Sequence, residues 1–175
     1  ASVKAELNGN EFLLSNTSGL YSGNALVEYF KMPGYYTINI SAVDELNLSS
    51  SLLVDFEYLS LLAIGLENTE LNLGKTEAGK SSSKTAIILN QGNVNVDIEV
   101  FGTDLTSGSK RINITNLELG ANNISKALTY RPELLDLNLI NGFSSQRNLE
   151  FKLNIPATTK PDIYAGSINL IGVMS

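Results

Sequence analysis

Hydrophobic and polar residues alternate along most of this chain, most clearly in the stretch GNVNVDIEV at residues 92–100. One set of alternate positions is apolar: Val94, Val96, Ile98 and Val100. The other set is polar: Asn93, Asn95, Asp97 and Glu99. Because successive side chains of a strand point to opposite faces of a sheet, the pattern predicts a strand with one buried and one solvent-facing side. On this interpretation Asp97→Ala costs less than about 1 kcal/mol.

The same alternation recurs in further stretches, which predicts several more strands. These are YTINISA (36–42), LLVDFEY (52–58), RINI (111–114), LEFKLNI (149–155) and IYAGSINLIGV (163–173). Turn-forming residues lie between the strands, in NGN, PG, NQGN, TSGS, NGF and TTKPD. Short strands joined by regular turns predict an all-β sandwich, with one helical turn expected at Pro132.

The spacing of the strands predicts two domains, at residues 1–57 and 58–175. The second has about the length of an immunoglobulin-type sandwich. The first holds five candidate strands, too few for a closed sandwich: Ser2–Leu7, Glu11–Leu14, Ala25–Phe30, Tyr35–Val43 and Leu52–Glu57. The predicted fold class is therefore all-β, with two tandem Ig-like antiparallel β-sandwich domains, the first short or incomplete. Either upstream residues or another chain would complete it.

Composition narrows the range of functions. The 175 residues are 43% hydrophobic and 17% charged, which is typical of a globular protein, and the net charge is −6. An acidic surface disfavours nucleic acid and anionic membranes. Neither Cys nor His is present, which excludes disulfides, thiolate metal sites, Cys nucleophiles and the usual general base. No apolar run is long enough to span a membrane. The chain starts at Ala1, which suggests a processed product or a fragment.

One stretch matches a nucleotide-binding motif. Residues 74–81, GKTEAGKS, fit the pattern G-x-x-x-x-G-K-[ST] at every fixed position. Such a loop needs a helix after it, whose N-terminus holds the phosphates. Residues 85–89 alternate instead, as a strand does. The sequence therefore predicts a loop between strands, with Lys80 in solvent and no bound nucleotide.

Three other kinds of sequence motif bear on catalysis, calcium binding and glycosylation. Residues 81–84 and 107–110 match the S-x-x-K of serine acyl-transferases, but both are predicted to be loops, whereas that chemistry needs a helix. Asp44 and Glu45 at a strand end could contribute to a calcium site, although no calcium-binding loop motif accompanies them. Five acceptor patterns for N-glycosylation begin at Asn16, Asn39, Asn47, Asn113 and Asn123. Roughly three to four are expected by chance in so Asn-rich a chain.

Residues 33–58 resemble the closing half of Ig-like repeats of the PKD type, with Pro33, Gly34 and Tyr36 in the expected places. Residues 71–105 look like the Ig-like modules of archaeal cell-surface proteins, on Gly74, Gly79 and the NQGN turn. Residues 155–173 are similar to the last hairpin of such modules, except that Asp162 stands where Gly is usual. The resemblance implies surface-layer, filament or adhesion proteins without an active site.

Taken together, these patterns predict a non-enzymatic structural protein of the cell surface, located outside the cell. The expected partners are copies of itself, other surface proteins and N-linked glycans. No catalytic, cofactor-binding or metal-binding residue is assigned. Residues 1–8 form a short alternating strand that can pair within its own domain or add to the sheet of a neighbour, and the sequence predicts head-to-tail polymerisation into a filament with a strand crossing between subunits. The alternative functions are an adhesin or carbohydrate-binding module, using Tyr21, Tyr130 and Phe143 in loops, or an accessory domain of an enzyme.

Overall fold

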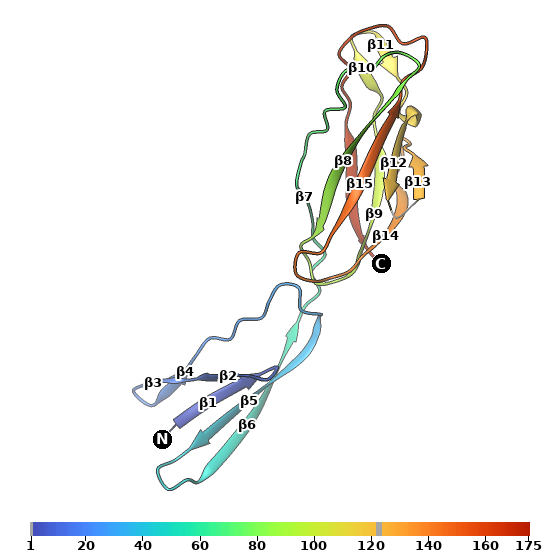
Figure 1. Ribbon diagram of the computed structural model, residues 1–175. Coiled ribbons are helices and arrows are strands. Elements are labelled where there is room, and N and C mark those ends of the chain that lie inside the picture. Colours follow the sequence, from blue (N-terminus) through green and yellow to red (C-terminus); the bar gives the residue numbers. More distant parts are fainter. Residues whose placement is uncertain (1, 122–123) are drawn as a thin grey trace. The chain divides into compact units, whose positions relative to one another are not determined.

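The structure, a computed structural model, describes residues 2–121 and 124–175, and over these residues the protein is all-β and built from antiparallel sheets (Figure 1). The predicted fold class is thereby confirmed. The chain folds as two units, Ala1–Leu61 and Leu62–Ser175, called unit 1 and unit 2 below. Within the described ranges, no helix has the length and apolar character needed to cross a membrane.

Unit 1 contains a four-stranded sheet in the order β2-β1-β5-β6 and a separate hairpin, β3-β4. The strands are β1 (Ser2–Leu7), β2 (Asn10–Leu13), β3 (Ser15–Thr17), β4 (Leu20–Ser22), β5 (Gly34–Val43) and β6 (Ser49–Tyr58). The first strand, β1, pairs with both β2 and β5 of its own chain, so it is an interior strand. The last strand, β6, pairs with β5 along all ten of its residues and is an edge of the sheet.

The predicted strand at Ala25–Phe30 is wrong, because this segment is irregular and ends in a turn where the Lys31 N–H donates to the Glu28 carbonyl (3.0 Å). Tyrosine hydroxyls of the sheet hold this part of the chain: Tyr58 reaches carbonyls of the segment itself, and Tyr36 reaches Met32 just after it. Tyr36 bonds to Met32 (2.6 Å), and Tyr58 lies 3.5 Å from the Glu28 carbonyl oxygen. The segment is therefore held to the sheet by side chains and not by a ladder of backbone hydrogen bonds.

Unit 2 is a β-sandwich whose two main sheets have the strand orders β13-β12-β15-β8-β7 and β14-β9-β16. The strands of the first sheet are β7 (Ile64–Leu66), β8 (Ser81–Asn90), β12 (Leu117–Ala121), β13 (Ile124–Ala127) and β15 (Gln146–Asn154). Those of the second are β9 (Val96–Gly102), β14 (Glu133–Leu139) and β16 (Ile168–Met174). A hairpin of β10 (Leu105–Ser107) and β11 (Lys110–Ile112) and a 3₁₀ turn, η1 (Ile114–Asn116), complete the unit.

The core of unit 2 lies between its two sheets and follows the predicted alternation. Val96 and Ile98 of β9 are fully buried, as are Leu149 and Phe151 of β15 on the facing sheet. Both sheets thus contribute every second residue to one interior. The expected helical turn at Pro132 is absent, and extended chain leads directly into β14.

Three polar positions of the 92–100 stretch differ from the prediction, since Asn93 is buried and Asp97 and Glu99 are half-buried. Asn93 is only 1% exposed because the chain bends before β9 begins at Val96, so the alternation does not extend back to it. Asp97 is half-buried, and its carboxylate accepts the backbone N–H groups of Leu137 and Asn138, each at 2.9 Å. These bonds lie where the register of β14 against β9 shifts, so Asp97 supplies a side-chain acceptor to the backbone of the irregular stretch.

Replacement of Ile98 by Ala is expected to lower the free energy of unfolding by about 2–5 kcal/mol, because it removes buried methyl groups and leaves a cavity. Replacement of Asp97 by Ala is expected to cost roughly 1–3 kcal/mol, since it removes the acceptor for two N–H groups. Chemical denaturation of both variants measures these values. A cost near zero for Asp97→Ala would show that the bulge does not need the carboxylate.

Candidate functional site

The candidate glycosylation sites are distributed over both units. Asn16 on β3, Asn39 on β5 and Asn47 in the β5–β6 turn are exposed, all in unit 1. Asn113 in unit 2 is half-buried, and its Oδ1 accepts hydrogen bonds from the N–H (2.9 Å) and the hydroxyl (2.7 Å) of Thr115. Asn123 lies outside the described residues. Glycosylation of these residues stays a prediction.

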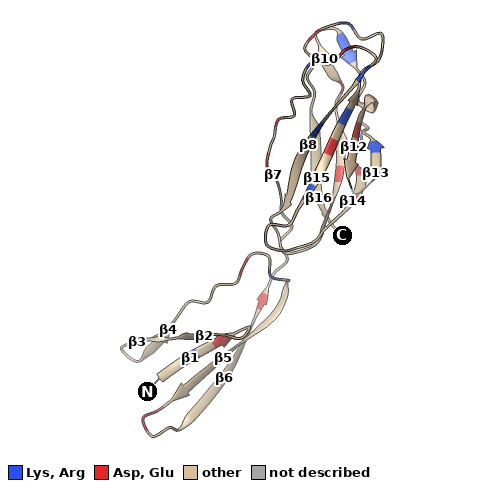
Figure 2. Ribbon diagram, in the orientation of Figure 1, with Lys and Arg blue, Asp and Glu red and all other residues tan. Residues whose placement is uncertain are grey.

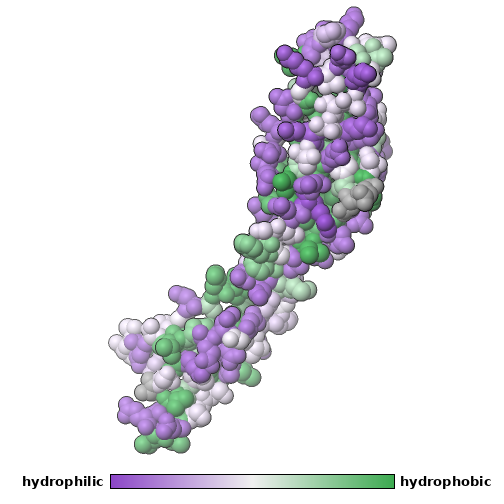
Figure 3. Space-filling model, in the orientation of Figure 1, coloured by the Kyte–Doolittle hydropathy of each residue, from purple (hydrophilic) through white to green (hydrophobic). Residues whose placement is uncertain are grey.

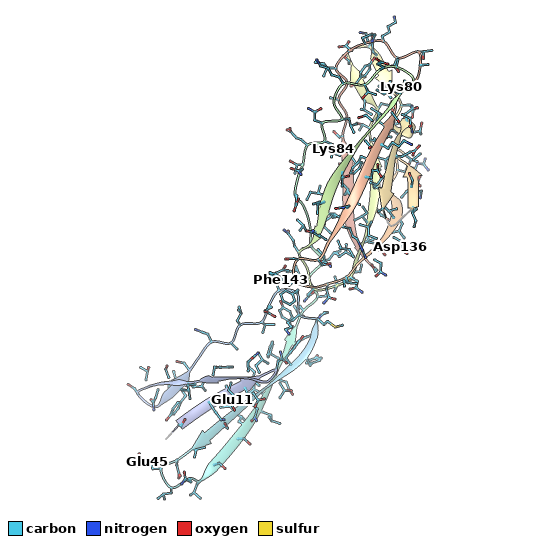
Figure 4. The ribbon with its side chains drawn as sticks, viewed as in Figure 1. Glu11, Glu45, Lys80, Lys84, Asp136 and Phe143 are labelled. Carbon is cyan, nitrogen blue, oxygen red and sulfur yellow. The ribbon has the colours of Figure 1, made fainter. Side chains whose placement is uncertain are left out.

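The nucleotide-binding pattern lies in a loop that leads into a strand. Lys80 stands just before β8, and its N–H closes a turn with the Glu77 carbonyl (3.1 Å) (Figure 4). Strand β8 begins at Ser81, the position at which a phosphate-binding helix would start. The first S-x-x-K segment, with Lys84, is part of the same strand, and the second spans the β10–β11 hairpin. None of these residues has the helical setting that its motif requires.

The other candidate residues take part in local structure. The Asp44 carboxylate accepts the N–H groups of Leu46 and Leu48, both at 2.8 Å, and so organises the β5–β6 turn that carries Glu45 (Figure 4). Tyr130 and Phe143 lie beyond opposite ends of β14, and the third aromatic residue, Tyr21, is on β4 of unit 1. Within unit 2, Tyr130 and Phe143 therefore form no shared platform, and a carbohydrate-binding role stays a prediction.

The most unusual feature of unit 1 is the apolar face of its four-stranded sheet. The strand register places apolar residues on one face in every strand: Val3, Ala5, Leu7, Phe12, Tyr36, Ile38, Ile40, Ala42, Leu52, Val54, Phe56 and Tyr58. Ala5 is 2% exposed and Leu7 is 5% exposed, whereas Leu52 is 60% exposed and Val54 is 41% exposed. Burial on this face is thus nearly complete at Ala5 and Leu7 of β1 and fails at Leu52 and Val54 of β6.

Within unit 1, the chain between β4 and β5 covers one end of this face, where Tyr36 bonds Met32 and Tyr58 lies close to Glu28. Near Tyr36 the cover is ordered: this ring stacks on Phe56 with centroids 5.7 Å apart and meets Tyr58 edge-on at 6.2 Å. Farther along β6, Leu52 and Val54 remain open to solvent. Figure 3 shows apolar side chains reaching the surface of unit 1.

The opposite face of the sheet is polar and acidic. Lys4 bonds Glu11 (2.6 Å), and the Thr37 hydroxyl donates to Asp55 (2.6 Å). Unit 1 carries two basic and seven acidic residues, a net charge of −5, while unit 2 carries ten and eleven, a net charge of −1 (Figure 2). Exposed apolar and aromatic residues also lie on this face, at Leu13 (74%) and Tyr35 (79%), and β6 adds Leu53 (66%). Leu53 directly follows Leu52, and two apolar residues in succession break the alternation of β6. This break was the sequence signal that indicated an unusual edge strand.

Unit 2 contains three carboxylates whose pKa values are lowered by specific partners: Glu133, chiefly by Lys126, and two near the β10–β11 hairpin, Asp104 and Asp162. The pKa of Asp104 is lowered, chiefly by the Tyr130 hydroxyl, which donates to it at 2.7 Å, and also by the Ile114 N–H. The pKa of Asp162 is lowered to about 2, chiefly by Lys110, whose Nζ lies 2.6 Å from Oδ2. Both clusters join loops around the β10–β11 hairpin, and sequence patterns had not indicated either one.

Neither a protein-family model nor a curated protein matches this chain. Three solved structures are distantly similar. A family 123 glycoside hydrolase from Clostridium perfringens matches 64% of this chain and 24% of its own, at 13% identity and a TM-score of 0.42. The CsuC–CsuE chaperone–tip adhesion subunit complex of Csu pili from Acinetobacter baumannii matches 98% and 84%, at 11% identity and 0.48. The secreted serine protease VesC from Vibrio cholerae matches 98% and 40%, at 12% identity and 0.31. The functions of these proteins are not transferred to this chain.

Replacement of Lys110 by Met is expected to raise the pKa of Asp162 from about 2 toward its ordinary value of 3.8. Because the folded-state pKa is lowered, Asp162 stabilises the fold above about pH 4, and this contribution is lost as the pH falls toward 2. An NMR titration of the Asp162 carboxyl carbon measures the shift, with Lys84→Met as the control. An unchanged Asp162 pKa in the Lys110 variant would show that the ion pair does not cause the shift.

Proposed function

We propose that this chain is a non-enzymatic structural protein of the cell exterior, a building block of a filament, stalk or surface layer assembled from copies of itself. The observation that supports this proposal is the apolar sheet face of unit 1, which the described residues leave open at Leu52 and Val54. A sheet with one apolar face gains stability when that face is covered, and here the cover is incomplete.

The free energy available from covering this face is substantial. Complete burial of a Leu or Val side chain stabilises a protein by about 1.5–3 kcal/mol. Leu52 and Val54 are adjacent on one face of β6, so one contact would bury both. Contiguous exposed apolar surface of this kind is typical of sites that bind another protein.

The strand that would cross between copies in this proposal is not β1. In the structure β1 pairs on both sides, with β2 and with β5, and it supplies the buried Ala5 and Leu7 of the sheet. Its removal would dismantle unit 1 and not merely uncouple two copies. The proposed assembly therefore uses the surface of a folded unit 1 and does not depend on donation of residues 1–8.

The extracellular location is supported by the resemblance of residues 33–58 and 71–105 to cell-surface Ig-like modules. We further propose that N-linked glycans are carried by the exposed acceptors Asn16, Asn39 and Asn47. Asn39 lies on the polar face of β5, opposite the apolar face. A glycan there would cover the acidic side of the sheet and leave the apolar face accessible for assembly.

The purified full-length chain is expected to form polymers or sheets that are visible by negative-stain electron microscopy, with a light-scattering mass well above 18.9 kDa. Replacement of both Leu52 and Val54 by Ser should abolish them, because it removes the apolar surface that assembly would bury.

A matched control is Leu134→Ser in β14 of unit 2, which removes a leucine that is 57% exposed and should leave assembly intact. A full-length protein that remains a monodisperse monomer at all concentrations would contradict the proposed function. So would equal loss of assembly in the Leu134 control.

A further inference from the structure

Strand β6 has a composition that changes along its length in an ordered way. It begins with Ser49, Ser50 and Ser51, continues with three exposed apolar residues and ends with Asp55 and Glu57 among aromatic residues. Hydroxyl donors therefore occupy one half of the strand and carboxylate acceptors occupy the other. A strand of this kind is complementary to itself when the second copy runs in the opposite direction.

The backbone of β6 is also available for pairing. The strand order ends at β6, so within the described chain one side of this ten-residue strand has no neighbouring strand. Edge strands are commonly protected by prolines, bulges or charged side chains, lysine above all, and the charged residues of β6 are Asp55 and Glu57 near its end. Strand β6 has no Pro or Lys, and its pairing with β5 is regular along its whole length.

We infer that β6 of one copy pairs with β6 of a second copy, antiparallel, across a two-fold axis at Leu53. This pairing rests on the proposed function only in that copies of the chain assemble. It adds which strands of the two copies meet. The four-stranded sheets of two copies would join into one continuous sheet. An isologous contact of this type closes on itself, so a polymer would need a further contact elsewhere on the chain.

This register matches side chains on both faces of the joined sheet. On the apolar face, Leu52 of each copy lies opposite Val54 of the other. On the polar face, Leu53 meets its own counterpart on the axis, and the two carboxylates face serines. The opposed pairs are Leu53 with Leu53, Leu52 with Val54, Ser51 with Asp55, Ser50 with Phe56, and Ser49 with Glu57.

Other arrangements of the two strands are less favourable. A parallel pairing in register would place Asp55 beside Asp55 and Glu57 beside Glu57, and like charges on neighbouring strands destabilise a sheet. A shift of one residue would place the apolar face of one copy beside the polar face of the other. If the two-fold axis passes through Val54, the apolar faces of both copies still lie on the same side of the joined sheet. Leu53 of one copy then lies opposite Asp55 of the other. Antiparallel pairing at Leu53 is therefore preferred.

The net charge of unit 1 should make the β6–β6 contact depend on salt concentration. Each unit 1 carries a charge of −5, so two copies repel each other at low ionic strength. Added salt screens this repulsion over about 10 Å at 0.1 M. Self-association through β6 should therefore strengthen as NaCl is raised, whereas contacts between oppositely charged surfaces would weaken.

The test is disulfide cross-linking of the full-length chain, which has no cysteine of its own. L53C places one thiol on the proposed axis, where Cα atoms of opposed residues lie about 4.5–5.5 Å apart, within disulfide range. Under mild oxidation L53C should form a covalent dimer about a thousandfold faster than free thiols at micromolar concentration, because pairing raises their effective concentration to about millimolar. An equimolar mixture of S51C and D55C should give a mixed dimer.

Two control variants make the test specific. L13C places a thiol on β2, at the opposite edge of the same sheet, where Leu13 is 74% exposed. V54C places a thiol on β6 itself, next to the axis but not on it. Both should cross-link slowly, and the dimer fraction of wild type measured by light scattering should rise with NaCl.

The outcomes separate this inference from the proposed function. Assemblies of wild type in which L53C cross-links no faster than L13C would overturn the β6 contact and leave self-assembly standing. Rapid cross-linking of V54C in place of L53C would overturn the register. Fast cross-linking of L53C in a chain that forms only dimers would support the contact and contradict the polymer. A monomeric wild type in which no variant cross-links would overturn both.

Discussion

The apolar face of a β-sheet has to be covered, and the two units of this chain meet that requirement to different degrees. In unit 2, the five-stranded and three-stranded sheets cover each other, so Ile98 and Phe151 are fully or almost fully buried. In unit 1, one four-stranded sheet has only a hairpin and an irregular segment beside it. Its face is closed at Ala5 and Leu7 and open at Leu52 and Val54.

The open face and the free edge of unit 1 occur on the same strand. Strand β6 carries the exposed apolar residues, has no neighbour on one side and belongs to a unit with a charge of −5. Its serines and carboxylates are arranged so that a second copy could satisfy them. The candidate site is therefore this exposed surface of unit 1 and not a cluster of catalytic or ligand-binding side chains. Unit 2 then provides a packed module to which such a surface is tethered.

The sequence predicted those parts of the fold that depend on local alternation. Strand β1 lies at the predicted Ser2–Leu7, and Val96, Ile98 and Val100 are buried as expected. The prediction failed where tertiary contacts decide the outcome. Asn93 is buried by a bend, Asp97 caps a bulge in β14, and the segment at 25–30 contacts the Tyr58 hydroxyl instead of forming a strand. The exposure of Leu52 depends on what covers the sheet, which alternation within one strand does not determine.

The central claim is that β6 is an assembly surface of unit 1, and hydrogen exchange of its backbone amides tests the claim most directly. Amides of Ser49–Tyr58 that point away from β5 should become more protected as the protein concentration rises from about 1 to 100 μM, because pairing with a second copy removes them from water. Amides of the other edge strand, β2, should exchange at a constant rate. Exchange of the outward β6 amides that is independent of concentration would contradict the account.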